Sequence, residues 1–277
     1  MTRICAAVRE RNERMDFGLK GRVAIVAAAS KGLGRAVAEE FAKEGCQVAI
    51  CSRTAADVEQ TAKEIGAASG REVFWRALDV TNADAVRDFV DAAEQKFGRI
   101  DICVTNAGGP PSKKFLEITL DEWRTAVNLT LLSAVYFARE VLPRMQRRHW
   151  GRLITITSIS VKQPIDGLLL SNSLRAGVTG MAKTLANEFG ADGITVNNVC
   201  PGFTLTDRLG ELFEKRAKDS GAKYEDLLKQ AAASVPIGRF ARPDEFAALV
   251  TFLASERASS INGTTIAIDG GMAKGLL

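Results

Sequence analysis

The residues with the clearest chemical signature form a turn of small side chains, Ala28-Ala29-Ser30-Lys31-Gly32-Leu33-Gly34. Such a turn between a strand and a helix lets backbone amides and the helix amino terminus face a pyrophosphate. The candidate phosphate-binding residues are therefore Ser30, Lys31, Gly32, Leu33 and Gly34. A lone Gly-x-Gly also occurs in ordinary turns, so the prediction of a nucleotide needs support from other residues.

That support comes from the end of the second predicted strand, where an NAD site carries an Asp or Glu for the ribose hydroxyls. This chain has Ser52 and Arg53 there, with no acid between Glu44 and Asp57. Arg53 and Lys31 are suited to clamp a 2′-phosphate, so NADP(H) is favoured and NAD(H) is the alternative cofactor. The competing interpretation is two solvated surface cations.

Regular elements must position these residues, and from residue 22 short apolar runs alternate with longer amphipathic stretches. The apolar runs predict strands over residues 23–27, 47–51, 73–78, 100–105, 152–157, 195–199 and 264–268. Apolar residues at three- and four-residue spacing predict helices over 34–43, 57–65, 83–97, 120–145, 171–189 and 243–253, and Thr119 with Glu122 makes a capping box before the longest. This alternation predicts an α/β fold with a doubly wound, parallel, seven-stranded sheet of Rossmann type in a single domain.

The 277-residue chain divides into an N-terminal extension, residues 1–18, and a domain over residues 19–277. The extension has neither an apolar core of signal-peptide type nor a regular period and is expected to be flexible. Met15 is an alternative start to Met1. Residues 204–235 form a polar, helix-prone insertion after the sixth predicted strand, where lids are found.

Composition argues against several classes of function. Thirty-seven Lys and Arg against thirty-three Asp and Glu give a net charge of +4, with no basic run for nucleic acid. No apolar run is long enough for a membrane helix. His149, the single histidine, follows two arginines and is expected on the surface. The five cysteines show neither a disulfide spacing nor a metal-ligand spacing, which indicates a reducing cytoplasmic location without a metal site. They are Cys5, Cys46, Cys51, Cys103 and Cys200.

From about residue 21 to residue 272 the chain resembles the short-chain dehydrogenases and reductases. The turn at 28–34 is similar to the family's Gly-x-x-x-Gly-x-Gly, with Ala27 and Ala28 in place of a Thr and the first Gly. The family's adenine contact, Asn-Ala-Gly motif and Pro-Gly turn look like Asp79-Val80, Asn106-Ala107-Gly108 and Pro201-Gly202. The resemblance implies that these residues, with Thr204 and Thr206, bind the dinucleotide.

In this family a Tyr is the general acid or base, a Lys four residues later holds the nicotinamide ribose, a Ser orients the substrate carbonyl and a helical Asn completes a water relay. Ser158 and Asn128 match the Ser and the Asn. The Tyr and Lys positions hold Ser171 and Arg175, and the chain's two tyrosines lie elsewhere. Arg175 is suited to hold ribose hydroxyls but not to relay a proton, and a serine hydroxyl is a poorer acid than a phenol.

The resemblance implies hydride transfer between NADPH and a small carbonyl or hydroxyl substrate, with an atypical proton donor and with Ser158, Ser171, Arg175 and Asn128 as the catalytic candidates. The alternative is a nucleotide-binding pseudoenzyme or sensor that has lost the chemistry. A general similarity to 3-oxoacyl carrier-protein reductases rests on the scaffold. The candidate pocket residues are Gly109, Pro110, Ser160, Phe203 and the insertion over residues 204–235. The family also implies a homo-oligomer, either a tetramer or a dimer.

Overall fold

The computed structural model describes residues 16–275, so most of the N-terminal extension, Met1 and Met15 among it, lies outside the described residues. The described chain contains one parallel sheet of seven strands in the order β3-β2-β1-β4-β5-β6-β7. The strands are β1 (Val23–Val26), β2 (Gln47–Ser52), β3 (Val73–Ala77), β4 (Ile102–Thr105), β5 (Gly151–Ile156), β6 (Ile194–Pro201) and β7 (Thr265–Ile268). Every predicted strand is therefore found, with ends that differ by at most two residues.

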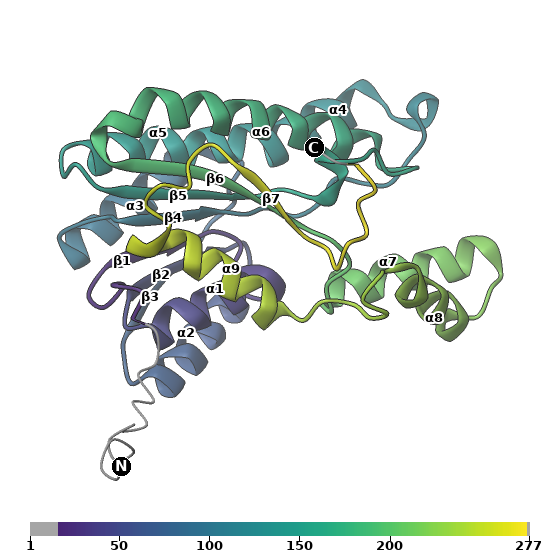
Figure 1. Ribbon diagram of the computed structural model, residues 1–277, viewed down its shortest axis with the longest axis horizontal. Helices are drawn as coiled ribbons and strands as arrows, with labels where there is room; N and C mark the ends of the chain where they lie inside the picture. The colour runs from purple at the N-terminus through teal and green to yellow at the C-terminus, as the bar shows by residue number, and fades with distance from the viewer. Residues whose placement is uncertain (1–15, 276–277) are drawn as a thin grey trace, which may run out of the picture.

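Helices cover both faces of the sheet (Figure 1). One face carries α1 (Gly32–Lys43), α2 (Ala55–Ser69) and α9 (Pro243–Ala254). The other face carries α3 (Ala83–Phe97), α5 (Ser133–Gln146) and α6 (Leu169–Phe189), with α4 (Leu120–Ala126) leading into α5. Four short helical turns lie in the connections: η1 (Phe115–Glu117), η3 (Ile159–Val161), η4 (Gly190–Asp192) and η5 (Glu256–Ala258).

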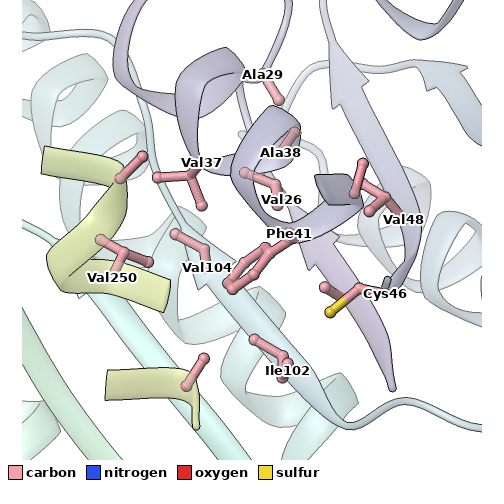
Figure 2. Close-up of a cluster of buried hydrophobic side chains, with 14 of the residues drawn as sticks. Val26, Ala29, Val37, Ala38, Phe41, Cys46, Val48, Ile102, Val104 and Val250 are labelled. Carbon is pink, nitrogen blue, oxygen red and sulfur yellow. The ribbon is translucent and has the colours of Figure 1, made fainter. Parts of the chain in front are cut away.

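Each strand divides its side chains between two cores because successive residues point to opposite faces. In β1, Ala24 and Val26 belong to the core under α1 and α9, whereas Val23 and Ile25 belong to the core under α3, α5 and α6. Figure 2 shows the first of these cores, with the Phe41 ring among side chains of the central strands and α9. Both faces of the sheet are thus buried, which is why its strands are continuous apolar runs.

The long helix predicted over residues 120–145 is interrupted, and this corrects the expectation of one regular α-helix. Its start is as predicted, since Thr119 N donates to Glu122 Oε2 at 2.9 Å and Glu122 N donates to Thr119 Oγ1 at 3.2 Å. A π-helical segment, η2 (Val127–Leu132), then separates α4 from α5. Such segments are rare and occur frequently at functional sites, and this one contains the candidate Asn128.

The insertion after β6 forms two helices, α7 (Asp207–Ser220) and α8 (Tyr224–Ser234), which project from one end of the sheet (Figure 1). They carry their own small apolar cluster around Phe203, Phe213 and Phe240, whose ring centroids are 5.7 to 6.1 Å apart. Residues 16–275 contain no helix that combines the length and apolar character needed to span a membrane.

Candidate cofactor and active site

The candidate residues gather at the carboxyl edge of the sheet. There the strand order reverses, because β1 pairs with β2 on one side and with β4 on the other. Crevices outside such a switch point are where parallel α/β sheets bind ligands. The loops that follow β1, β2, β3, β4, β5 and β6 all open at this edge, so the candidate residues come from six loops and from the helices beside them.

The turn after β1 brings its backbone close to the first helix. Ala28 has a φ of 49°, a left-handed conformation that the first Gly of the family's motif adopts without strain. Asn106 Nδ2 donates to the Ala28 carbonyl at 3.4 Å, so the Asn-Ala-Gly motif braces the turn. A Cβ on Gly34 would lie 2.5 Å from the same carbonyl oxygen, so only glycine fits there.

The amino terminus of α1 is open to an anion. Its N-cap residue, Lys31, makes no side-chain capping hydrogen bond, and the first turn contains no acidic residue. The amides of that turn therefore keep free donors and the positive end of the helix dipole. Thr206, at the start of the insertion, lies across the turn, with its Cγ2 3.6 Å from the position of a Cβ on Gly32.

The residues after β2 fit the phosphorylated ribose predicted from the sequence. Arg53 and Lys31 are both exposed, and neither forms an ion pair with any of residues 16–275. Ser52 is buried at 8% exposure, and its hydroxyl has no hydrogen-bond partner within the described chain. Ser52 directly precedes Arg53, so within the described chain an orphaned hydroxyl adjoins an unpaired cation, and both groups are donors suited to a 2′-phosphate and its ribose.

The remaining cofactor candidates lie on neighbouring loops of the same edge. Asp79 is exposed, with Oδ1 accepting from the amide and hydroxyl of Thr81 at 2.9 and 2.8 Å, and Val80 beside it is buried. Pro201 ends β6, and the carbonyl of Gly202 accepts from Thr204 Oγ1 at 3.4 Å. The carbonyl of Thr204 accepts from Thr206 Oγ1 at 3.4 Å. The threonines thus form a turn that leads from the sheet into α7.

Three serines form a cluster of hydroxyls at the carboxyl end of β5. Ser158 caps η3, and its Oγ accepts from the Ser160 amide at 3.1 Å. Ser160 Oγ and Ser171 Oγ lie 3.3 Å apart, and both side chains are buried. The sequence assigned Ser160 only to the pocket lining, whereas the structure places it between the two catalytic candidates Ser158 and Ser171.

Arg175 lies one helical turn beyond Ser171 and points at the end of β5. Its Nη1 donates to the carbonyls of Ile156 and Thr157, both at 3.0 Å. Its Nε and Nη2 make no hydrogen bond with any described residue, which leaves donors for ribose hydroxyls. Burial lowers the pKa of Arg175 to about 10, so the guanidinium is still charged at neutral pH.

The side chain of Asn128 makes no hydrogen bond with Arg175. Its Oδ1 accepts from the phenol of Tyr136 at 3.1 Å, two turns further along the interrupted helix. A cavity of about 10 Å³ separates the guanidinium from η2, and Thr130, Ser133 and Asn106 contribute to its walls. This volume is about the lower limit for one water molecule. Sequence reasoning missed Thr130 and Ser133 because neither belongs to a motif.

The loop after β4 contacts both the loop before α6 and the insertion. Ser112 Oγ donates to the Gly167 carbonyl at 2.9 Å, and Lys215 Nζ in α7 donates to the Ser112 carbonyl at 3.5 Å. Arg208 Nη2 lies 3.6 Å from where a Cβ on Gly109 would be. The insertion therefore contacts the loop after β4, across the edge where the candidate residues gather.

A switch-point crevice with an open helix amino terminus and a buried hydroxyl cluster defines the class of dinucleotide-binding oxidoreductases. Residues 27–273 match the family model described as Enoyl-(Acyl carrier protein) reductase. The chain is 34% identical to D-threitol dehydrogenase of Mycolicibacterium smegmatis, over 92% of this chain and 94% of the relative. It is 35% identical to 3-oxoacyl-(acyl-carrier-protein) reductase FabG of Pseudomonas aeruginosa, over 92% and 99%.

Among solved structures, L-sorbose reductase from Gluconobacter frateurii, complexed with NADPH and L-sorbose, is similar with a TM-score of 0.90 and 35% identity. The match covers 95% of this chain and 100% of the L-sorbose reductase chain. The chain belongs to the short-chain dehydrogenase/reductase family, and it is an oxidoreductase.

Proposed function

We propose that the protein is an NADP(H)-dependent reductase of a small carbonyl compound that works without the family's tyrosine. The observation that carries this proposal is the serine cluster beside Arg175, at the same edge as the free cations Lys31 and Arg53. L-sorbose reductase, similar over nearly its whole length, was crystallised with NADPH, which supports the choice of cofactor. When bound, the dinucleotide supplies the hydride.

The chain's own groups bind and orient the substrate. Ser158 and Ser171 are placed to hydrogen-bond a carbonyl oxygen, and Ser160 fixes the Ser171 hydroxyl. Arg175 stays protonated at neutral pH and contributes positive charge near the oxygen on which negative charge develops. The proton that completes the alcohol then comes from water through the hydroxyl cluster, because no phenol is available there.

The test measures the oxidation of NADPH in the presence of a panel of ketones and 3-oxoacyl thioesters. The loss of NADPH absorbance reports the rate. We expect slow but measurable turnover, because the loss of a positioned general acid typically costs about 10²- to 10⁴-fold in rate. Ser171→Ala and Ser158→Ala should each lower kcat further. Ser173→Ala is the matched control, since Ser173 lies exposed on the same helix.

The double variant Ser171→Tyr with Arg175→Lys separates this proposal from a pseudoenzyme. A reductase should turn over its substrate before the change and faster after it. If the native chain binds NADPH but reduces nothing, while the double variant gains ketone reductase activity, the native protein is a nucleotide-binding pseudoenzyme or sensor. The lid role of residues 204–235, the homo-oligomeric assembly and the cytoplasmic location stay predictions of the sequence.

A further inference from the structure

A second cavity, of about 260 Å³, lies at the opposite edge of the sheet from the candidate nucleotide site. It opens between the amino ends of β5 and β6, beside η4 and the start of η5. Its polar walls include Arg152, Thr195, Asn262 and Glu256, and Trp150 contributes an aromatic side. None of the candidate cofactor or catalytic residues borders this cavity.

Arg152 is the unusual residue of this cavity. Its side chain is only 2% exposed, which is rare for a cation. Nη1 donates to the carbonyls of Gly151 at 2.8 Å and Gly193 at 3.2 Å. Nε is buried without a partner, and Nη2 makes no hydrogen bond to any of residues 16–275. Nε and Nη2 share one edge of the guanidinium, the edge that takes two parallel bonds from an oxyanion.

The nearest carboxylate, that of Glu256, is divided between Arg152 and two other partners. Glu256 Oε1 accepts from Arg22 Nη2 and from Trp150 Nε1, both at 2.8 Å. Its Oε2 lies 3.7 Å from Arg152 Nη2, which is too long for a hydrogen bond. Burial lowers the pKa of Arg152, and the charge of Glu256 offsets this effect only in part.

The other charged groups around the cavity have partners of their own. Asp101 pairs with Arg22 at 3.6 Å and with Arg99. Asp192 accepts from Gln146 at 2.8 Å and lies 4.0 Å from the exposed His149. The guanidinium edge formed by Nε and Nη2 of Arg152 therefore makes no hydrogen bond within the described chain, and its one charged partner there is Glu256 Oε2, in the ion pair at 3.7 Å.

A second polar group of the cavity wall also lacks a partner. Thr195 is 6% exposed, and its hydroxyl makes no hydrogen bond within the described chain. A buried hydroxyl or guanidinium hydrogen without an acceptor is destabilising, so two such residues in one cavity wall indicate a ligand that satisfies both. The guanidiniums of Arg22 and Arg152 also lie over the Trp150 ring, at 3.7 and 4.3 Å from its centroid, which holds the cations in place.

We propose that this cavity is a binding site for a small oxyanion, a phosphate or carboxylate group, held by the free edge of Arg152 and the hydroxyl of Thr195. Two oxygens of the anion accept from Nε and Nη2, and Thr195 Oγ1 donates to one of them. Displacement of Glu256 Oε2, which makes no hydrogen bond with any described residue, opens this edge to the ligand, while Oε1 keeps its hydrogen bonds from Arg22 and Trp150. The site is separate from the reaction centre and stands whether or not the proposed reductase activity is found.

The experiment is isothermal titration with inorganic phosphate and, separately, with succinate, each against sodium chloride at equal ionic strength. The protein is saturated with NADPH, because phosphate also suits the nucleotide site, and the titration is repeated on Arg53→Ala. We expect saturable binding of one equivalent of at least one anion, unchanged by Arg53→Ala. Which anion binds distinguishes a phosphate source from a carboxylate source.

Two variants test the residues. Arg152→Met should weaken binding by at least about 10-fold, because it removes a charged bidentate contact. Thr195→Val keeps the shape of the side chain and should weaken binding by about 3- to 10-fold. Circular dichroism shows whether Arg152→Met folds, and if it does not, Thr195→Val decides alone. The absence of saturable binding to the native protein, or affinity unaffected by Thr195→Val, overturns the proposal.

Discussion

Ala28 carries the strain of the turn between β1 and α1 in its own backbone. A non-glycine residue with a φ of 49° pays about 1–2 kcal/mol for the left-handed conformation. The surroundings hold it there, because Asn106 donates to its carbonyl and the next amide, Ala29 N, donates to Cys51 O at 3.0 Å. The conformation thus follows from the need to turn between β1 and α1, at a position where the family has glycine.

Ala28→Gly should therefore stabilise the protein by about 0.5–1 kcal/mol. This is the free energy gained by relieving the left-handed conformation, minus the free energy lost because glycine has more conformational freedom in the unfolded chain. Urea unfolding followed by circular dichroism measures this difference. Ala29→Gly is the matched control, since Ala29 is buried and lies outside the left-handed region. It should destabilise the protein, and equal effects of the two changes would show that the φ of Ala28 is not a source of strain.

The candidate site could be predicted from sequence wherever a motif fixes a residue's place at the end of a strand. The departures at Ser171 and Arg175 were visible from their spacing to Ser158. The contact of Ser160 with Ser171 was not visible in the sequence, because it depends on the turn η3, which no sequence pattern predicts. The hydrogen bond from Tyr136 to Asn128 was hidden for a similar reason, since their spacing along the helix depends on the π segment.

Charged residues form a capping box at the start of α9. Glu245, in its first turn, accepts from the Arg242 amide at 2.8 Å and from both Nη atoms of Arg239 at 2.9 and 2.7 Å. The Arg239 hydrogen bond first, and then the Arg242 amide, lower the pKa of Glu245 from 4.5 to about 2. The folded state therefore prefers the ionised carboxylate, and protonation weakens the helix start.

The contribution of Glu245 to the free energy of unfolding should consequently change with pH over one acidic range. The contribution is fully present above pH 4.5, where the carboxylate is ionised even in the unfolded chain, and it is lost as the pH falls from about 4.5 to about 2. The urea midpoints of the native protein and Glu245→Gln should differ by a constant amount above pH 5 and converge below it. Glu59→Gln, which removes an exposed pair with Lys63, is the control and should change the midpoint little. A difference independent of pH would contradict this prediction.

The elements were the most predictable part of the molecule, because buried strands and amphipathic helices leave periodic patterns. The strands of the sheet and the capping box of Thr119 and Glu122 follow from local residues alone. The π segment does not, since residues 120–145 carry an unbroken apolar period, and it is this segment that packs on α6 in the fold. The order of strands likewise depends on long-range pairing.

At the scale of the whole molecule, cofactor binding should appear as added stability. A ligand at 100 times its Kd stabilises the folded state by about 2.7 kcal/mol, which raises the Tm of a chain this long by about 5–10 °C. NADPH should give a larger shift than NADH at equal concentration, and Arg53→Ala should remove the difference. Arg124→Ala, exposed on α4, is the control and should keep it. Equal Tm shifts with NADPH and NADH in the native protein would contradict the prediction that Lys31 and Arg53 select NADP(H).

The strand order also has a consequence for how the chain acquires its structure. β1 is the first strand to leave the ribosome, yet Ala24 must pair with Ile102 of β4 before the middle of the sheet exists. Parallel partners so distant in sequence make loop closure a slow step of folding. A nascent chain that ends before β4 therefore leaves the backbone N–H and C=O groups along one edge of β1 unpaired. The earliest intermediates should depend on chaperones until β4 has been synthesised.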